Sequence, residues 1–331
     1  MAPRVPTPSD ILAAAARLRG IALDTPLDPA PSLAAISGAA EVRLKLEALQ
    51  PTGSFKTRGA HNRVALLAAA RDAGDAPDLP IVAASSGNHG IAVAHAAARY
   101  GMRATILVGA SVSPAKLERL RALETDALTV EIHGRDTDDA EAEARRRDEL
   151  GAATYLSPYN DPEVIAGQGT IGLEILSAWP ECDAILAPVG VGGLISGIGT
   201  WTRAVQPGVR LVGIQPSASP TLYAYLQSGS TKPMPIAPTL ADGVAGNNER
   251  SSITWSLCRR LVDDMVLVDE EEIAEAMRWA VAEQHLLLEG SGVLGIAALQ
   301  QRRAAGLEGR RVAVICTGRN VDADTIRAVL S

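Results

Sequence analysis

The stretch Pro51-Thr52-Gly53-Ser54-Phe55-Lys56-Thr57-Arg58-Gly59-Ala60 stands between a strand-like run and the start of a predicted helix. The run before it, Val42 to Glu47, alternates apolar and polar residues as a strand does. Lys56 therefore leaves a turn directly beside Phe55, the only phenylalanine in the chain. An aromatic neighbour removes water from an amine and favours its neutral, nucleophilic form. The stretch predicts a lysine that can form a Schiff base, the alternative being a solvated lysine at a helix start.

Outward from this stretch the chain repeats one unit, in which a short apolar strand is followed by a glycine-containing turn and a helix. The later predicted strands cover residues 81–84, 104–108, 184–187, 211–214 and 312–315. Such alternation is typical of parallel sheets that carry helices on both faces. We therefore predict an α/β fold.

The length of 331 residues and the hydrophobic content of 47% suffice for two lobes of ordinary size. We expect a small lobe of residues 50–150, inserted into a large lobe made of residues 1–49 and 151–331. The active site, with any cofactor that it uses, is expected in the cleft between the lobes. The segment Ser228 to Pro238, rich in proline, serine and glycine, is a candidate loop or lid.

Charge and cysteine content exclude several classes of protein. The formal net charge is −7, and the 31 basic and 38 acidic residues are spread evenly, so no basic stripe is available for nucleic acid or an anionic membrane. The cysteines, Cys182, Cys258 and Cys316, predict neither a disulfide framework nor a zinc site. Residues 1–10 lack the pattern of an export signal, and no apolar run has membrane-spanning length. We expect a soluble cytoplasmic protein that acts on a small molecule.

Two glycine turns suggest anion sites. The turn Pro188 to Leu194 follows an apolar strand and precedes a helix, so its backbone N–H groups can converge on a phosphate. It lacks the third glycine of a dinucleotide fingerprint, and the next strand ends in Gln215 rather than an acid. The turn Ser85 to Gly90 aims hydroxyls and helix N-terminal amides at one point, which suits a carboxylate. Close strand–helix packing and an ordinary helix cap are the alternatives for the two turns.

A reactive lysine, a phosphate loop and a carboxylate loop together match pyridoxal phosphate with an amino acid. At this point the chain resembles the fold-type II pyridoxal-phosphate enzymes, and within them the serine/threonine dehydratase and serine racemase group. Residues 51–60 are similar to the family's Schiff-base segment, Ser85-Ser86-Gly87-Asn88-His89-Gly90 to its substrate-carboxylate loop, and Ala166-Gly167-Gln168-Gly169-Thr170-Ile171-Gly172 to its interlobe signature. The similarity covers nearly the whole chain. It implies a fold like that of the tryptophan synthase β chain, with two lobes that each hold a mostly parallel sheet flanked by helices.

The resemblance also implies how the cofactor binds. Lys56 would form a Schiff base with pyridoxal 5′-phosphate, Phe55 would pack against its ring, and Asn88 would hydrogen-bond its 3′-oxygen. Thr317, in Cys316-Thr317-Gly318-Arg319-Asn320, stands where the family has a serine that faces the pyridine nitrogen. The phosphate would be held by the loop of Gly190, Val191, Gly192, Gly193 and Leu194.

Substrate contacts follow from the resemblance in the same way. Tyr159 matches a pocket-facing position, and Arg135 stands where racemases place an arginine near the substrate. Ser86 matches the residue that protonates the opposite face in racemases, so it is a second catalytic candidate beside Lys56. The substrate carboxylate would lie on the loop made of Ser85, Ser86, Gly87, Asn88 and His89.

The implied activity is β-elimination from a β-hydroxy-α-amino acid, such as threonine, serine or the bulkier phenylserine. Lys56 would take the α-proton, the β-hydroxyl would leave as water, and the products would be a 2-oxo acid and ammonia. A dehydratase of 3-hydroxyaspartate or of hydroxyectoine degradation, and a serine or amino-acid racemase, stay open as alternatives. A non-catalytic binding relative is disfavoured by the intact Lys56 and Asn88, and a nicotinamide dehydrogenase by the incomplete fingerprint.

The chain departs from the family at a few positions. Val191 stands where glycine is common and is compatible only with a negative φ. Arg319 replaces a glycine beside Thr317, and its cation would oppose ring protonation, reach the substrate, pair with Glu289 or point to solvent. Some relatives bind a divalent cation through acids at two positions that here are Gln215 and Thr221, so we predict no metal.

The end of the sequence and the resemblance give two further expectations. Biosynthetic threonine deaminases carry a regulatory extension, whereas this sequence stops shortly after Asn320, which favours a catabolic role. A homodimer is expected from the family.

Overall fold

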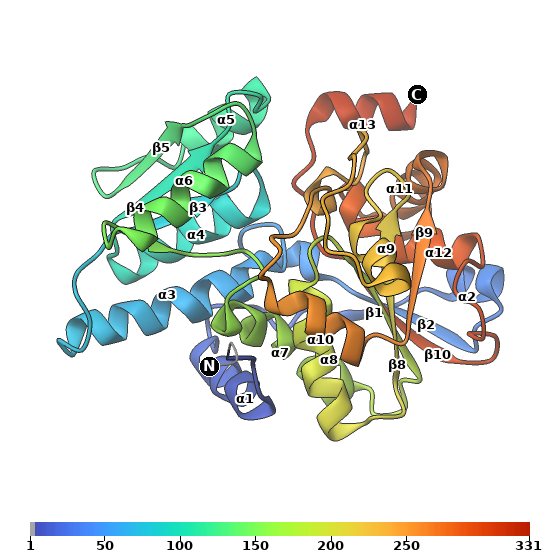
Figure 1. Ribbon diagram of the computed structural model, residues 1–331. Coiled ribbons are helices and arrows are strands. Elements are labelled where there is room, and N and C mark those ends of the chain that lie inside the picture. The colour runs from blue at the N-terminus through green and yellow to red at the C-terminus, as the bar shows by residue number, and fades with distance from the viewer. Residues whose placement is uncertain (1–3) are drawn as a thin grey trace.

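The computed structural model describes residues 4–331, so the first three residues of the N-terminal stretch considered above lie outside it. Its strands form two separate sheets (Figure 1). The larger sheet has the strand order β1 (Leu27–Pro29), β2 (Glu41–Lys45), β10 (Arg311–Ile315), β7 (Ala184–Pro188), β8 (Arg210–Pro216) and β9 (Asp264–Val268). The smaller sheet has the order β5 (Leu128–Ile132), β4 (Ala104–Val108), β3 (Ile81–Ala84) and β6 (Thr154–Tyr155). Neighbouring strands are parallel except for the pair β1 and β2.

The helices complete the alternation that the sequence predicted. In residues 4–331 they are α1 (Pro8–Arg17), α2 (Pro31–Ser37), α3 (Lys56–Asp72), α4 (Asn88–Tyr100), α5 (Pro114–Arg121), α6 (Thr137–Glu149), α7 (Pro162–Ala178), α8 (Gly193–Val205), α9 (Thr221–Ser228), α10 (Ile253–Leu261), α11 (Glu270–Gln284), α12 (Leu294–Gln300) and α13 (Ala323–Leu330). Short 3-10 turns occur at η1 (Glu47–Leu49), η2 (Asp242–Val244) and η3 (Gly290–Val293). The predicted α/β fold with helix-flanked parallel sheets is confirmed.

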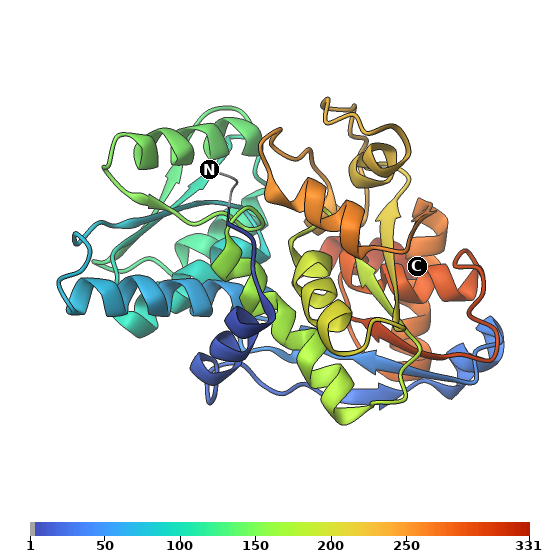
Figure 2. The same cartoon turned by 60° about the horizontal axis from the view of Figure 1, so that its bottom comes forward.

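Both faces of each sheet are covered, because successive residues of a strand point to opposite sides. On β10, Val312 and Val314 pack in one core with α11 and α12, whereas Ala313 and Ile315 pack in another with α7 and α8. Figure 2 shows α7 and α8 crossing one face of the larger sheet. The smaller sheet is covered by α3 and α4 on one face and by α6 on the other.

The smaller sheet sets the extent of the small lobe. Its strands run from β3 to β6, and β6 lies beyond residue 150, where the sequence placed the boundary. We propose that the small lobe ends after β6. Helices α3 and α7 then join the two lobes, and they are in extensive contact with one another.

Three helices meet through glycines at this junction. A Cβ on Gly167 of α7 would lie 2.7 Å from the Cα of Gly59 in α3. A Cβ on Gly197 of α8 would lie 2.6 Å from the backbone nitrogen of Gly169 in α7. Side chains cannot occupy these positions, because the backbones themselves are in contact. The motif from Ala166 to Gly172 is therefore explained by close packing of α7 against two neighbours.

A buried ionic cluster lies beside the glycine contacts. The Arg58 guanidinium donates to both carboxylate oxygens of Glu47 at 2.8 Å, to Glu174 at 2.7 Å and to Thr170 Oγ1 at 3.0 Å. Lys45 Nζ donates to the same Glu174 at 2.6 Å. Arg58 is 1% exposed and Glu47 is fully buried. The cluster joins the start of α3 to β2, η1 and α7.

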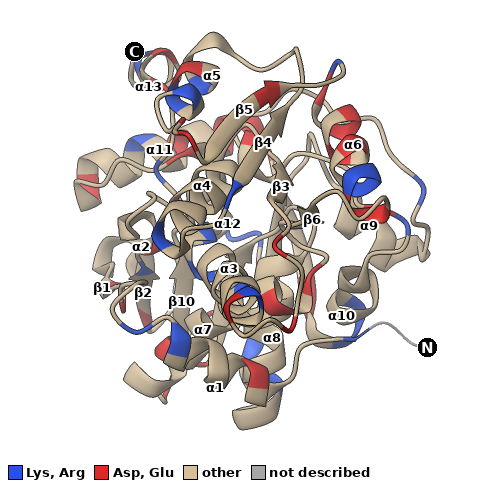
Figure 3. Ribbon diagram, turned by 90° about the vertical axis from the view of Figure 1, so that its left-hand side faces the viewer, with Lys and Arg blue, Asp and Glu red and all other residues tan. Residues whose placement is uncertain are grey.

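The surface matches the predicted charge distribution. Lys and Arg are interspersed with Asp and Glu, for example on α6 (Figure 3). None of the helices in the described chain has the length and apolar composition that a membrane span requires. Cys182, Cys258 and Cys316 are buried and free.

Glu47→Ala is expected to destabilise the protein strongly, because it leaves the Arg58 cation buried without its bidentate partner. Removing one member of a buried ion pair typically costs about 3–5 kcal/mol. Urea unfolding followed by circular dichroism measures the free energy of unfolding. Glu271→Ala is the matched control, since that carboxylate is 79% exposed beside Arg278 and is expected to contribute less than about 1 kcal/mol. Equal losses in the two variants would contradict a dominant role for the buried cluster.

Candidate active site

The turn that carries Lys56 is attached to the segment after β10. Phe55 N donates to Thr317 O at 3.0 Å, and Arg319 N donates to Gly53 O at 3.0 Å. Gly53 has φ +76°, a conformation that favours glycine. The chain leaves this turn with Lys56 as the first residue of α3. Backbone pairing with the end of the larger sheet thus positions the backbone from which the Lys56 side chain extends.

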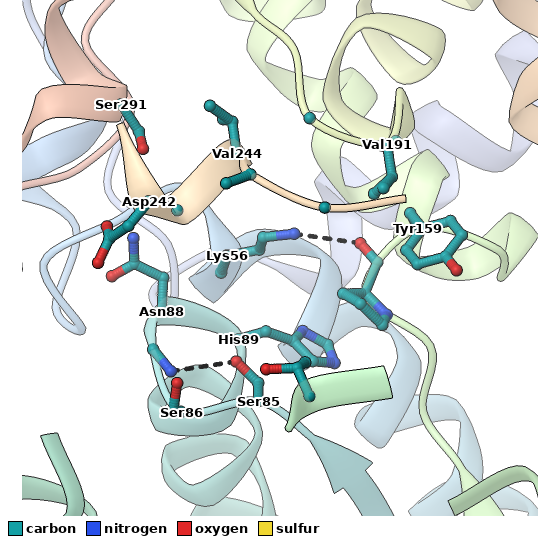
Figure 4. A pocket seen from close by; sticks show the side chains of 18 of the residues that line it. Lys56, Ser85, Ser86, Asn88, His89, Tyr159, Val191, Asp242, Val244 and Ser291 are labelled. Carbon is teal, nitrogen blue, oxygen red and sulfur yellow. Dashed lines mark hydrogen bonds between the residues drawn. The ribbon is translucent and has the colours of Figure 1, made fainter. Parts of the chain in front are cut away.

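The Lys56 amine lies inside a cavity of about 640 Å³. Its Nζ donates to Pro158 O at 3.2 Å and lies 5.0 Å from the centre of the Phe55 ring (Figure 4). Burial lowers the pKa of Lys56 to about 8, although the nearby Glu289 carboxylate favours its charged form. A minority of this amine is therefore neutral near physiological pH, far more than for an ordinary lysine, which favours the Schiff-base prediction.

Most of the residues that the sequence singled out line this one cavity, although they come from distant parts of the chain. The lining includes Phe55, Lys56, Ser85, Ser86, Gly87, Asn88, His89, Tyr159, Gly190, Val191, Gly192, Gly193, Leu194, Glu289 and Thr317. Figure 4 shows Lys56 between the Ser85–His89 loop, Tyr159 and Val191.

Arg135 and Arg319 lie elsewhere. The side chain of Arg135 is 88% exposed and pairs with Asp139 at 3.3 Å. Arg319 is exposed, and the described structure contains no ion pair between it and Glu289. Neither arginine lines the cavity, so their proposed roles toward substrate or cofactor remain predictions without support from this geometry.

The glycine loop has the shape of an anion cradle. A Cβ on Gly190 would lie 3.0 Å from Val244 O. Gly192 has φ +90°, and a Cβ there would lie 2.7 Å from Cys258 Sγ. Among residues 4–331, the non-glycine residues with positive φ are His285 and Arg302, so Val191 has the negative φ that its side chain requires. The loop ends at the N-terminus of α8, where unpaired N–H groups and the helix dipole favour an anion.

The serine loop sits at the N-terminus of α4, which begins at Asn88. Ser85 Oγ accepts a hydrogen bond from Gly87 N at 3.2 Å. His89 Nε2 donates to Leu156 O at 2.9 Å, and burial together with the Lys56 charge lowers the pKa of His89 to about 3. Its ring is therefore neutral, and Nδ1 is a buried acceptor without a protein partner. His89 lines the cavity together with the rest of the loop that the sequence assigned to the substrate carboxylate.

A hydrogen-bonded chain orients the Asn88 carboxamide. Asn88 Nδ2 donates to Glu289 Oε1 at 2.7 Å, while Asn88 Oδ1 accepts from Asn320 Nδ2 at 2.6 Å. Asn320 Nδ2 also donates to Thr52 O at 2.9 Å. Because both ends of the amide are held, the second Nδ2 hydrogen of Asn88 remains available for a bound molecule. Asn320 was quoted in the C-terminal motif but given no role, since nothing in the sequence indicates that it meets Asn88.

The Glu289 carboxylate packs against Gly318, at a place where a larger side chain would not fit. A Cβ on Gly318 would lie 2.5 Å from Glu289 Oε1, and Asn320 N donates to Oε2 at 3.0 Å. Burial raises the pKa of Glu289 to about 7. This carboxyl group is therefore close to its titration point at neutral pH, in direct contact with the amide that it orients.

The residues present fit pyridoxal phosphate. Lys56 supplies a partly neutral amine, the glycine loop supplies an anion cradle, and Asn88 has an unused N–H. Ser291 Oγ, which lines the cavity near Thr317, is buried and has no protein partner. Thr317 Oγ1 donates to Ser291 O at 3.3 Å. Within residues 4–331, no group of three His, Cys, Asp or Glu side chains is arranged to hold a metal ion.

Comparisons with known proteins agree with this assignment. A family model described as pyridoxal-phosphate dependent enzyme matches residues 18–318. The chain is 37% identical to the L-threonine ammonia-lyase of Thermotoga maritima, over 98% of this chain and 78% of that protein. It is 36% identical to the L-threo-3-hydroxyaspartate ammonia-lyase of a Pseudomonas species, over 97% of each.

Solved structures show the same relationship. The structure of maize serine racemase superposes with a TM-score of 0.88 at 29% identity, covering 98% of this chain and 97% of that one. The processed form of threonine deaminase isoform 2 from Solanum lycopersicum gives a TM-score of 0.86 at 32% identity, covering 97% and 90%.

The pKa of Lys56 predicts how the apoprotein takes up its cofactor. Only the neutral amine attacks an aldehyde, so the rate of pyridoxal phosphate incorporation should rise with pH to a midpoint of about 8 rather than the usual 10.5. Stopped-flow absorbance measures this rate. Glu289→Gln should move the midpoint to lower pH, because the Glu289 charge raises the pKa of Lys56. Glu283→Gln, on the exposed face of α11, is the control and should leave the midpoint unchanged. A midpoint near 10 in the unmodified protein would refute the burial argument.

Proposed function

The chain belongs to the family of pyridoxal-phosphate-dependent enzymes, and on that basis we propose that it is an ammonia-lyase acting on β-hydroxy-α-amino acids. The reaction removes water across Cα and Cβ, and hydrolysis of the resulting enamine gives a 2-oxo acid and ammonia. The observation that carries the proposal is that one cavity joins a partly neutral lysine, an anion cradle and a serine loop at a helix N-terminus. The curated relatives reported above, both named as ammonia-lyases, support the reaction class.

The chain's own residues divide the chemical work. When bound, pyridoxal phosphate supplies an electron-withdrawing ring that weakens the Cα–H bond of the attached amino acid. Lys56 holds the cofactor and then, as a free amine, takes the α-proton at Nζ. Ser85, Ser86 and the N-terminus of α4 bind the substrate carboxylate. These assignments rest on the family resemblance together with the shared cavity.

We assign Thr317 and Asn88 to contacts with the cofactor ring. Thr317 offers a neutral hydroxyl for the ring nitrogen, which stabilises a protonated ring far less than a carboxylate would. A ring that withdraws electrons only moderately suits an elimination, in which the leaving group discharges the developing negative charge at once. Asn88, held by Glu289 and Asn320, is assigned to the ring oxygen next to the aldehyde.

The cavity wall favours a substrate with an uncharged side chain. Its acidic lining residues are Asp136, Asp138, Glu141, Asp242 and Glu289. Lys116, the other lysine in the lining, already pairs with Asp242, and Arg135 points away. Tyr159 OH donates to Glu141 at 3.1 Å, so the aromatic ring forms a fixed wall. A second substrate carboxylate would meet like charge here, which ranks threonine, serine and phenylserine above 3-hydroxyaspartate.

Racemisation is the second candidate activity. Ser86 and Lys56 line the same cavity, which is a precondition for proton transfer on the two faces of Cα. The similarity to maize serine racemase supports it. Chiral chromatography of L-serine incubated with the enzyme separates the two reactions, since racemisation yields D-serine and elimination yields pyruvate.

We further propose that the enzyme is a cytoplasmic homodimer. The buried, free cysteines are compatible with a reducing compartment, and the family resemblance supports dimerisation. Light scattering after size-exclusion chromatography measures the oligomeric state directly.

The purified protein should show the visible absorption band of lysine-bound cofactor and should release 2-oxo acid from at least one β-hydroxy amino acid. Lys56→Ala should lose both the band and the activity, because the amine that holds the cofactor and takes the α-proton is gone. Lys232→Ala changes an exposed lysine and serves as the control. A protein without the band after addition of pyridoxal phosphate, or an active Lys56→Ala variant, would refute the proposal.

Substrate ranking gives a separate prediction. The kcat/KM for threonine or serine should exceed that for 3-hydroxyaspartate by about tenfold or more, corresponding to about 1.4 kcal/mol of like-charge repulsion. Coupled assay of 2-oxo acid release across the panel measures the ratio. Asp138→Asn should lower this ratio of kcat/KM values, since Asp138 lines the cavity and makes no ion pair in the described structure. A preference for 3-hydroxyaspartate would overturn the ranking.

A further inference from the structure

Two buried amide side chains hold the carbonyl groups of the glycine loop. Gln215, fully buried on β8, donates from Nε2 to Gly190 O at 3.1 Å. Asn248, 6% exposed, donates from Nδ2 to Val191 O at 3.0 Å. The two acceptors are consecutive peptide carbonyls of the loop that forms the anion cradle. Neither amide belongs to the motifs that carried the family resemblance.

Holding a carbonyl also orients the N–H group of the same peptide unit. In a trans peptide the C=O and the following N–H point in opposite directions. Gln215 therefore turns the Val191 N–H away from β8. In the same way, Asn248 turns the Gly192 N–H away from the Asn248 side chain. Within residues 4–331, these two N–H groups donate to no protein acceptor, and both residues line the cavity. Two oriented and unused donors are what an anion requires.

The oxygen ends of the two amides differ, because Gln215 Oε1 is paired whereas Asn248 Oδ1 is buried without a protein partner in the described residues. Gln215 Oε1 accepts from Tyr223 N in α9 at 2.8 Å, so its carboxamide cannot flip without losing two hydrogen bonds. Asn248 Nδ2 also donates to Thr254 Oγ1 at 3.2 Å, in the first turn of α10. The loop is thereby fixed to β8, α9 and α10 through neutral groups.

We propose that Gln215 and Asn248 are positioning residues that aim the Val191 and Gly192 N–H groups at the cofactor phosphate, and that they do so without a metal ion. The inference rests on the proposed function only through the identity of the phosphate-bearing cofactor. Gln215 presents its nitrogen to the loop and its oxygen to α9, so it offers the loop no oxygen that could bind a divalent cation together with Gly190 O.

We call Gln215 and Asn248 the two clamps of the glycine loop, and isosteric variants test them. Gln215→Glu places a carboxylate oxygen where Nε2 now faces Gly190 O, and Asn248→Asp does the same at Val191 O. Both replace an attractive contact by repulsion between oxygens, so the loop carbonyls should turn away. Gln227→Glu, exposed on α9, makes the same chemical change away from the loop and is the control. Thermal unfolding of each apoprotein establishes that the variants are folded.

The readout is the affinity for pyridoxal phosphate divided by the affinity for pyridoxal, both measured by absorbance titration of the apoprotein without substrate. Gln215→Glu and Asn248→Asp should each lower this ratio about tenfold or more, because only the phosphate contacts are lost. Gln227→Glu should leave it unchanged. An unchanged ratio in both clamp variants would overturn the proposal. If the ratio is unchanged because both affinities fall equally, the two amides have a merely structural role.

Metal dependence provides an independent arm. The unmodified protein should bind pyridoxal phosphate equally well with EDTA or with Mg²⁺, whereas Gln215→Glu should recover affinity when Mg²⁺ is added, since a cation can then bridge the carboxylate and Gly190 O. A loss of affinity in EDTA for the unmodified protein would refute the metal-free clamp. Failure of the lyase assay alone would leave the binding ratio intact, so the two proposals fail separately; an unmodified protein that binds neither compound would refute both.

Discussion

The Arg58 guanidinium makes all its hydrogen bonds inside the protein, to two carboxylates, a threonine hydroxyl and a backbone carbonyl. Burying such a cation is costly, and it is tolerated only because Glu47 and Glu174 neutralise it and satisfy its donors. The cluster brings together the start of α3, the end of β2 and the middle of α7, which come from well-separated parts of the sequence. Lys56 is two residues from Arg58, so this ionic contact, together with the backbone pairing of the preceding turn, determines where Lys56 lies.

Burial and neighbouring charges also act together on the ionisable groups within the cavity. Lys56 is desolvated enough to be partly neutral, while Glu289 opposes that effect. Glu289 is itself buried, and its carboxylate also orients Asn88 through a direct hydrogen bond. The lysine and the glutamate therefore titrate in the same pH range, and a change in either charge affects the other. The side chains that hold Asn88 and the glycine loop from the other side, Asn320, Gln215 and Asn248, are neutral amides.

Sequence reasoning predicted the α/β fold from local patterns, whereas most of the residues that line the cavity were singled out through the family resemblance. Strands β3 and β4 are continuous apolar runs, and they occur where predicted. Strands β1, β5, β6 and β9 were not predicted, and each lies at a sheet edge. In β5, partial exposure permits the polar residues Thr129 and Glu131, which weaken the apolar pattern, whereas residues 265–268 of β9 form an apolar run that the prediction missed. Asn320 and Asn248 were assigned no role for a different reason. Their importance arises from partners more than fifty residues away in sequence, and no periodicity reports such contacts.

The glycine contact between α3 and α7 has a mechanical consequence. Helix α3 has 17 residues and is about 25 Å long, and Gly59 lies near the end that carries Lys56. If the smaller sheet turns about this contact, α3 acts as a lever whose fulcrum is beside the lysine. A rotation of about 5° displaces the far end by about 2 Å and the lysine by only a fraction of that. A rotation of this kind would therefore move the smaller sheet while Lys56 keeps its position relative to the glycine loop.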